Sequence, residues 1–398
     1  MDANRLSKIL HPGLFAMALC LEIRIRAIFY LVFKYFVVLA TITTLLPNVA
    51  PAQSVGETLF TVTGVSVDET AGDDLTAKNN GILEAQRRSL RRLLKRLTLR
   101  DDHDRLPNLA KNTLAQVIRD FSVEGEKFGG GRYLASLTTR FKPREIRELL
   151  QSEGISFAET VSRPALIIPI YAVGGATLLW ENPNPWFAAL ARRRSGDGLI
   201  STFVPLGDLS DVLEINAEQA LRGDKIRLDS IASKYNAFSA YVAMAALSIN
   251  SRNGVPTLHV SLNRHGDGQS IQKKVLTFTG VPGLSIESLL NDAAERLVIE
   301  IEETWKSENL LRFELEQWIS VQVPLIGHLE WLSVRRRLDN VAGLRRIVLT
   351  RLSVNTVDLD FLFVGETEQL RVAMAQSELI LVYSSDNGTW TLKRSESN

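Results

Sequence analysis

The chain has 398 residues, of which 45% are hydrophobic and 23% are charged, and its formal net charge is +1. A chain of this length and hydrophobicity can bury two or three ordinary cores, and it has no low-complexity tail that would indicate disorder. The near balance of charge argues against nucleic-acid binding, which requires a basic surface.

The first 52 residues follow the order of a secretory leader. A basic flank, which contains Arg24 and Arg26, precedes an uncharged and mostly apolar run at residues 35–46. Ala50 and Ala52 then supply the small residues that a signal peptidase requires at −3 and −1. We therefore predict a signal peptide over residues 1–52 and a folded body that is exported to a bacterial periplasm.

A retained membrane anchor is the alternative interpretation of this leader. Residues 27–46 are about as long as a helix that spans a bilayer. Lys34 lies within this span, and a central lysine costs roughly 2.5–3.5 kcal/mol on insertion. Met17 also offers a second start for a shorter leader. The body is therefore expected either to be soluble in the periplasm or to be tethered to the inner membrane by residues 27–46.

The only cysteine, Cys20, lies inside the leader. Leu19 is not the small residue that a lipoprotein signal has at this place, so we do not expect lipidation. The exported body is then free of cysteine, which excludes disulfides, thiolate metal sites and a thiol nucleophile.

An α+β domain is predicted at residues 55–155. Alternating apolar residues predict a strand at 58–67, and apolar residues at helical spacing predict a helix at 77–97. A second helix, a hairpin around three glycines and a helix that begins at Pro143 follow. The order β-α-α-β-β-α indicates a small sandwich of helices on a sheet.

A second domain with a mixed sheet is predicted at residues 163–309. It opens with a continuous apolar strand at 165–173, of the kind that is buried on both faces. Helices at 186–194 and 226–235 alternate with strands, and three strands then follow in a meander. A long helix at 286–305 closes the segment.

A third domain is predicted at residues 312–394. Its elements follow the order β-α-β-β-α-β and end in a hairpin with a turn at Asp386 and Asn387. This order is the split β-α-β pattern of ferredoxin-like domains. The fold class predicted for the whole body is therefore α+β, with three small mixed α/β units after the leader.

No motif with catalytic or metal-binding spacing is present. The four histidines of the body, His103, His259, His265 and His328, are isolated from one another in the sequence. We therefore predict no cofactor and no metal.

One helix carries a dense basic face. Residues of this face repeat at a spacing of four, and like charges at this spacing destabilise a helix by roughly 0.2–0.5 kcal/mol per pair. The face consists of Arg87, Arg88, Arg91, Arg92, Lys95 and Arg96. Its charge can be relieved by acidic residues that bracket the helix, such as Asp73 and Asp101, or by an anionic partner in the envelope.

A rigid loop follows the first strand of the second domain. Trp180 and Trp186 frame an Asn-Pro segment that contains Asn184, at the end of a strand where mixed sheets bind ligands. Aromatic residues are also common anchors of interfaces. We predict Trp180, Asn184, Trp186 and the nearby Asp208 as partner-binding residues. The alternative is that Asn184 caps a helix while both tryptophans fill the core.

These motifs resemble the domain of unknown function 2066 family of proteobacteria. The resemblance rests on the segment from Glu84 to Thr98, on Trp180 with Asn184 and Trp186, and on residues 205–208. The second domain is also similar, more loosely, to the N-terminal domain of the periplasmic Tol-B family, apart from its Asn-Pro-Trp insertion. The first resemblance implies no particular activity, and the second, looser one implies a role in envelope assembly or scaffolding rather than catalysis.

These patterns favour one function and leave a second as the alternative. The first is a non-enzymatic periplasmic interaction or scaffold protein that binds envelope proteins or the membrane surface. The second is a periplasmic enzyme, such as a hydrolase, with a cleft near the loop from Trp180 to Trp186.

Overall fold

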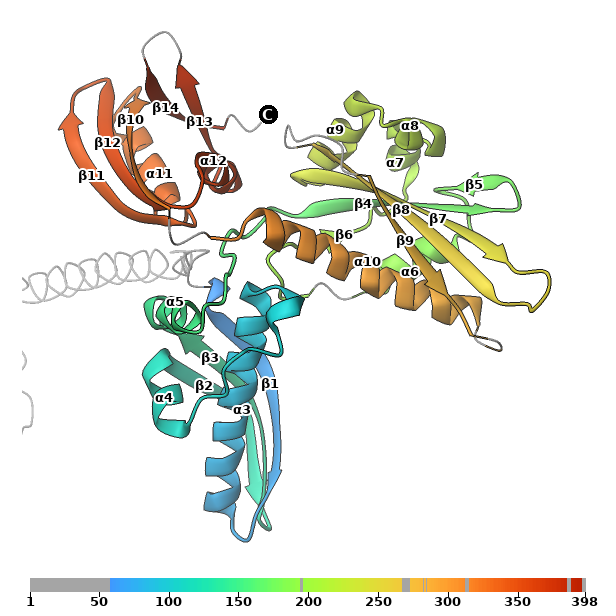
Figure 1. Ribbon diagram of the computed structural model, residues 1–398, viewed down its shortest axis with the longest axis horizontal. Coiled ribbons are helices and arrows are strands. Elements are labelled where there is room, and N and C mark those ends of the chain that lie inside the picture. The colour runs from blue at the N-terminus through green and yellow to red at the C-terminus, as the bar shows by residue number, and fades with distance from the viewer. Residues whose placement is uncertain are drawn as a thin grey trace, which may run out of the picture. The chain divides into compact units, whose positions relative to one another are not determined.

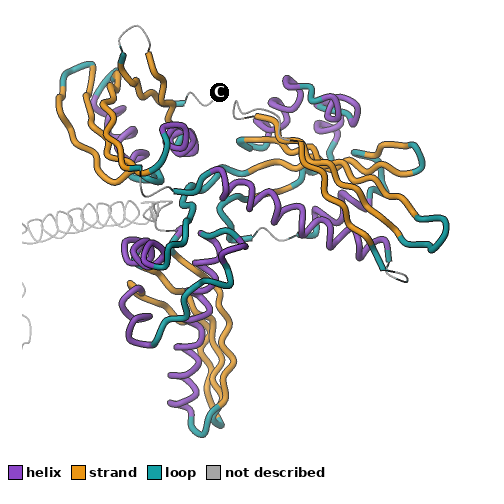
Figure 2. The backbone as a smooth tube through the Cα atoms, viewed as in Figure 1, coloured by secondary structure: helices purple, strands orange, loops and turns teal. Residues whose placement is uncertain are grey.

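The computed structural model describes residues 58–193, 196–266, 273–281, 283, 285–311, 315–384 and 388–395. The predicted leader, the turn that follows Gly266 and the turn at Asp386 and Asn387 lie outside the described residues. The described chain has an α+β fold with three separate sheets, as predicted (Figures 1 and 2).

The first sheet has three antiparallel strands in the order β1-β3-β2. Its elements are β1 (Thr61–Thr70), α3 (Asp74–Leu97), η1 (Arg100–Asp102), α4 (Lys111–Val117), β2 (Ile118–Gly129), β3 (Arg132–Phe141) and α5 (Pro143–Ser152). The helix α3 packs against the sheet through buried residues such as Leu90 and Leu93. Gly81 allows the close approach, because a Cβ there would lie 2.6 Å from Val67 Cγ1.

The second sheet is mixed and follows the order β5-β4-β7-β8-β9, with β6 also paired to β4. β4 pairs in parallel with β6 and β7, and the other pairs are antiparallel. The strands are β4 (Ala165–Val173), β5 (Ala176–Leu178), β6 (Thr202–Phe203), β7 (Ser239–Ile249), β8 (Pro256–Gly266) and β9 (Lys273–Thr279). The first seven residues of β4 are buried, which agrees with its continuous apolar run.

Helices cover both faces of this second sheet (Figure 1). α6 (Pro185–Ala191) and α10 (Ile286–Glu308) share one buried cluster with alternate residues of β4, such as Ile167. α8 (Ala217–Arg222) and α9 (Lys225–Lys234) share another with the intervening residues, such as Ile168. The short α7 (Leu209–Glu214), which the sequence did not predict, packs beside α9.

The third sheet has five strands in the order β11-β12-β10-β14-β13. Its elements are β10 (Glu316–Pro324), α11 (His328–Leu338), β11 (Leu344–Leu352), β12 (Thr356–Val364), α12 (Thr367–Gln376), β13 (Leu379–Ser384) and β14 (Thr389–Arg394). Both helices lie on one face, where Val334 of α11 and Met374 of α12 join the same core as Phe361 of β12.

The third sheet departs from the ferredoxin-like pattern at one edge. β12 lies antiparallel between β10 and β11, which is the predicted split β-α-β unit. The closing hairpin, however, contributes two strands, and β14 lies parallel beside β10. A ferredoxin-like sheet has a single strand in this place, antiparallel to its neighbour. Here the second strand of the hairpin, β14, lies between β10 and β13, so β13 forms the edge of the sheet.

The end of α10 joins the second sheet to the first. Trp305 Nε1 donates to the carbonyl of Thr160 at 2.7 Å. Lys306 is buried and its ammonium donates to the carbonyls of Lys95 and Thr98, each at 3.0 Å, and to Glu303 at 3.1 Å. A buried cation at the carbonyl end of α3 satisfies backbone acceptors and opposes the negative end of the helix dipole.

Candidate functional site

Two of the predicted loop residues have structural roles. Asn184 caps α6, because its Oδ1 accepts from the amide of Phe187 at 3.0 Å. Its Nδ2 donates to the carbonyls of Leu178 and Leu179. Trp186 is fully buried and its Nε1 donates to the carbonyl of Ala243 at 3.0 Å. Neither side chain is placed to contact a partner directly, since both are enclosed by their own domain.

Trp180 lies instead beside the other predicted segment, residues 205–208. Its Nε1 donates to the carbonyl of Ile215 at 2.7 Å, and its ring meets Phe187 edge to face at 6.5 Å between centroids. A Cβ at Gly207 would lie 3.6 Å from the Trp180 ring. The structure therefore brings Trp180 and the loop that carries Asp208 together, although 28 positions separate the two residues.

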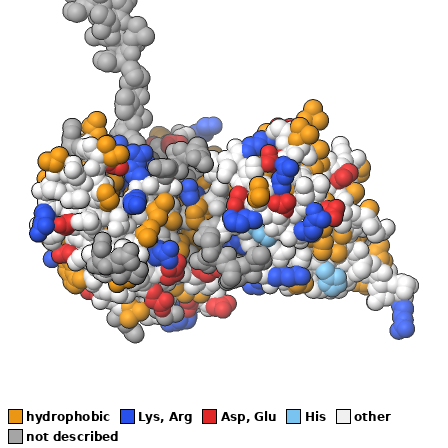
Figure 3. All heavy atoms as spheres, turned by 90° about the horizontal axis from the view of Figure 1, so that it is seen from above, with side chains coloured by type: hydrophobic (Ala, Val, Ile, Leu, Met, Phe, Trp, Pro, Cys, Tyr) orange, Lys and Arg blue, Asp and Glu red, His pale blue; other side chains and the backbone are white. Residues whose placement is uncertain are grey.

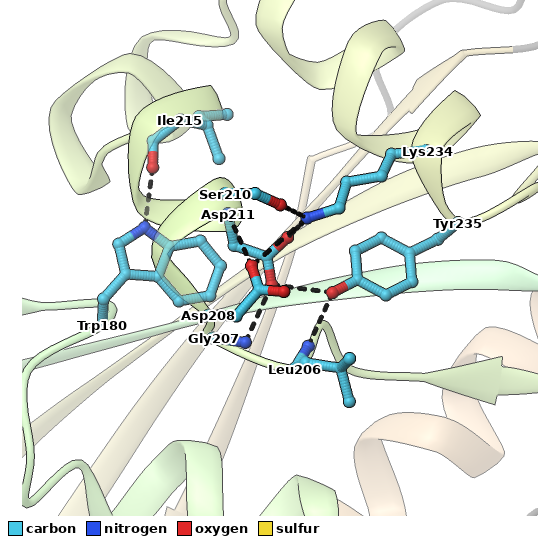
Figure 4. A network of polar contacts seen from close by, with 9 residues as sticks. All are labelled: Trp180, Leu206, Gly207, Asp208, Ser210, Asp211, Ile215, Lys234 and Tyr235. Carbon is cyan, nitrogen blue, oxygen red and sulfur yellow. Dashed lines mark hydrogen bonds and ion pairs between the residues drawn. The ribbon is translucent and has the colours of Figure 1, made fainter.

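A polar cluster around Asp211 fixes this loop to α7 and α9 (Figure 4). The carboxylate of Asp211 is fully buried and accepts from the Gly207 amide at 2.8 Å and the Tyr235 hydroxyl at 2.7 Å. Lys234 donates to Asp211 at 2.6 Å and also contacts Asp208 and Ser210. Asp208 caps α7 by accepting from the Asp211 amide at 2.9 Å. The cluster satisfies a buried carboxylate from three directions, which makes the loop rigid.

The charges of this cluster do not favour catalysis. The hydrogen bond to Asp211 raises the pKa of Lys234 above its usual value, so the ammonium stays protonated. The backbone hydrogen bond from Asp211 lowers the pKa of Asp208. A lysine that activates a serine must be neutral to accept its proton. The contact between Lys234 and Ser210 therefore does not supply a nucleophile and general base.

The loop and helices that this cluster holds together expose an apolar surface that the sequence patterns did not predict. We name Leu206, Leu209, Leu213 and Ile226 the α7 apolar face; each is between 78% and 83% exposed. Arg227 donates to the carbonyl of Glu214, which places the start of α9, with Ile226, beside the end of α7. Figure 3 shows that hydrophobic side chains lie at the surface of the molecule among charged ones of both signs. The spacing of Leu209 and Leu213 was a helical signal, but an exposed stripe and a buried one look alike in sequence.

The charged residues around the α7 apolar face are paired with one another. Arg222 meets Glu218 at 2.7 Å, and Lys225 meets Asp229 at 2.5 Å. Lys234 is held by the Asp211 cluster. An apolar centre with a rim of polar and paired groups is the usual composition of a protein interface.

The predicted basic face of α3 is partly neutralised within the chain. Arg96 is buried, and its guanidinium donates to the carbonyls of Leu59 and Thr61 at 2.6 and 2.9 Å. Arg92 and Arg96 both bind the carboxylate of Asp197, at 2.6 and 3.1 Å. The counter-charge comes from the loop before β6 and not from Asp73 or Asp101, since Asp73 caps α3.

The remaining arginines of this face line a separate cavity. Arg88 donates to the Ser66 carbonyl at 2.6 Å, and Arg87 lies 3.9 Å from Glu84. Together with Arg91 and the segment from Pro107 to Leu109 they enclose about 370 Å³. Lys95 is exposed on the same helix. We therefore keep Arg87, Arg88, Arg91 and Lys95 as the residues that are predicted to meet an anionic partner.

The described part of the chain also bears on metal sites and membrane spans. There, no group of three or more His, Cys, Asp or Glu residues is arranged to hold a metal ion. Among the same residues, none of the helices combines the length and the apolar character needed to cross a bilayer.

Comparison with known proteins gives only partial structural likenesses. Neither a protein-family model nor a curated protein matches the sequence. A solved PelC dodecamer from Paraburkholderia phytofirmans is 12% identical, with a TM-score of 0.22, over 36% of this chain and 92% of that one. Lipoprotein GNA1162 from Neisseria meningitidis is 12% identical, with a TM-score of 0.23, over 35% of this chain and 97% of that one. We therefore base the function on the side chains of this chain itself.

Proposed function

We propose that the chain is an exported, non-enzymatic protein of the bacterial envelope that binds a partner protein through the α7 apolar face. Export is inferred from the leader at residues 1–52. The observation that carries the binding role is the exposure of four large aliphatic side chains on a loop and on the helices α7 and α9, which a buried polar cluster holds together.

Rigidity matters because it reduces the cost of binding. A side chain that is already ordered loses less entropy when a partner covers it. The Asp211 cluster fixes α7, and the ring of Trp180 lies against the turn at Gly207. Trp180 and Asp208 thus position the α7 apolar face, whereas Asn184 and Trp186 support the domain behind it.

The charges of this surface favour a protein over a membrane as its occupant. Binding to anionic lipid uses a surplus of lysine and arginine beside the apolar residues. Around the α7 apolar face each of Arg222, Lys225 and Lys234 already has a carboxylate partner. Among the described residues, this surface therefore has no unpaired basic rim to attract lipid headgroups.

In-cell photo-crosslinking tests this proposal. The crosslinker p-benzoylphenylalanine is placed at Leu213 in the full chain, and in a second chain at the exposed Ile326 as the matched control. We expect a specific product at Leu213 only, identified by mass spectrometry as one envelope protein, and lost when Leu209→Asp is added. The purified partner should then bind the unmodified chain and bind the Leu209→Asp variant at least about tenfold more weakly, the effect of losing one interface anchor.

Two results would contradict the proposal. One is the absence of any product at Leu213, or a product made only of two copies of this chain. The other is co-sedimentation with vesicles of phosphatidylethanolamine and phosphatidylglycerol that Leu209→Asp abolishes, since the occupant would then be the membrane.

A further inference from the structure

A large cavity lies away from the α7 apolar face. It has a volume of about 790 Å³ and is lined by α5, by the segment from Glu159 to Pro164, by residues between α11 and β11, and by the end of α12. Small-molecule sites typically measure 300–1,000 Å³ and often lie where separate folding units meet. The size and place of the cavity are therefore those of a ligand site.

The lining of this cavity is strongly basic. Three carboxylates, Glu159, Asp339 and Glu378, face twice as many arginines. The arginines are Arg119, Arg147, Arg163, Arg336, Arg337 and Arg345. Arg147 is committed to Glu159 through two hydrogen bonds of 2.6 and 2.8 Å, and Arg337 binds Glu378 at 2.7 Å. The cavity thus keeps a positive surplus after its internal ion pairs are formed.

Arg163 and Gln376 place two unused donors on one wall. The Gln376 Oε1 accepts from the Arg163 amide at 2.6 Å, which holds the two residues together. Arg163 Nε and Gln376 Nε2 are both buried and have no hydrogen-bond partner. The Arg163 guanidinium also stacks over the Phe238 ring at 4.5 Å, which fixes its orientation. Buried donors without acceptors are costly, so a site that keeps two of them together is suited to an acceptor-rich ligand.

Arg345 is a further donor in the same cavity. Burial lowers its pKa, and the negative charge of Glu159 opposes this effect. Among the described residues no carboxylate lies within hydrogen-bonding distance of its guanidinium. A guanidinium recognises phosphate and carboxylate oxygens through its planar fork of N–H groups. Arg163, Gln376 and Arg345 offer separate donors, and the terminal oxygens of a phosphoryl group, three in a monoester and two in a diester, can receive them.

One wall of the cavity carries an unused acceptor. The Oδ1 of Asn340 is buried without a partner, while its Nδ2 donates to the Arg336 carbonyl at 3.2 Å. An acceptor of this kind requires a donor such as a hydroxyl group. The ligand should therefore combine an anionic group with hydroxyls, and an inorganic anion alone would leave Asn340 unsatisfied.

We propose that this cavity binds a phosphorylated polyol, with the phosphoryl group at Arg163, Gln376 and Arg345 and a hydroxyl at Asn340. The same chemistry occurs in free sugar phosphates and in phosphoglycerol headgroups of lipids. The site is independent of the docking surface, since none of its lining residues belongs to the α7 apolar face.

Isothermal titration calorimetry on the full chain tests the site. The probes are glucose 1-phosphate for a free source, dihexanoyl phosphatidylglycerol for a headgroup source, and glucose as the neutral control. The variants are Arg163→Gln and Arg345→Gln. The matched control is Arg346→Gln, because Arg346 is the exposed neighbour of Arg345 and does not line the cavity.

We expect saturable binding of at least one phosphorylated probe and none of glucose. Arg163→Gln and Arg345→Gln should each weaken that binding by about tenfold or more, as expected for a lost charge-assisted hydrogen bond. Arg346→Gln should leave it unchanged, and circular dichroism should show all three variants folded. The proposal is overturned if neither phosphorylated probe binds, or if the two cavity variants bind as tightly as the Arg346→Gln control.

Discussion

At the scale of single residues, Asp211 is the side chain that positions α7. A carboxylate with no solvent exposure requires hydrogen-bond partners, and Asp211 receives bonds from Gly207, Lys234 and Tyr235. These partners come from the loop and from α9, on either side of α7. The residue therefore acts as a clamp that positions the leucines of the α7 apolar face.

Replacing this carboxylate should loosen α7 locally. We expect Asp211→Asn to cost about 2 kcal/mol of local stability, because the amide keeps the shape but weakens hydrogen bonds made to a charge. Hydrogen exchange measured by mass spectrometry over residues 206–215 provides the readout. Asp229→Asn, which removes a half-exposed i,i+4 pair, is the control and should change exchange by less than about 0.5 kcal/mol. Equal exchange in the two variants would show that Asp211 is not a clamp.

At the scale of elements, two arginines on the basic face of α3 form ion pairs with a loop from another part of the sequence. Asp197 binds both Arg92 and Arg96, and so ties α3 to the segment before β6. Burial raises the pKa of Asp197, but the hydrogen bond and charge of Arg92, together with the charge and hydrogen bond of Arg96, outweigh it, so the pKa lies below 3.8. The carboxylate is therefore charged at any physiological pH.

This contact should contribute to stability in a pH-dependent way. Because the folded-state pKa lies below the ordinary 3.8, the stabilisation is present above that pH and is lost as the pH falls through the folded-state pKa. We expect Asp197→Asn to lower the free energy of unfolding by about 1 kcal/mol at pH 7, a modest value because the pair is partly exposed. Urea unfolding at pH 7 and pH 3 measures it, and the difference between variant and parent should shrink at pH 3. A difference that is the same at both pH values would contradict an electrostatic origin.

At the scale of the whole molecule, the predicted leader at residues 1–52 bears on where the cavity and the α7 apolar face would meet their partners. Lys34 divides the apolar stretch, which favours a signal peptide over a retained anchor. A cleaved body is free to meet soluble and membrane-bound partners, whereas an anchored one reaches only those close to the inner membrane.

The predicted cleavage site defines which residue becomes the new N-terminus. We expect Gln53 as the first residue of the exported chain, identified by N-terminal mass spectrometry of the periplasmic fraction. Ala52→Leu should block processing, because the −1 position accepts only small residues, whereas Ser54→Leu beyond the cut should not. A chain that keeps Met1 or Met17 and sediments with membranes would identify residues 27–46 as an anchor.

Much of the fold could be predicted from local patterns in the sequence. The strand β4 has the predicted bounds, and α3 and α10 each share one end with their predicted ranges. The helices have clear apolar periodicity and β4 is a continuous apolar run, and both patterns reflect burial that the sequence itself encodes. The six-residue α7 was missed because a helix so short has less than two turns of pattern to detect.

The candidate sites depended on contacts between segments that are far apart in the chain. The sequence alone determined which residues carry charge or aromatic rings, and it identified Trp180, Asp208 and the arginines of α3 as unusual. Only the tertiary structure decided that Trp186 is buried, that Asp197 neutralises Arg92, and that Leu209 and Leu213 face solvent. The physical reason is that burial and pairing are properties of neighbours in space, and the same side chain serves as core or surface according to what packs against it.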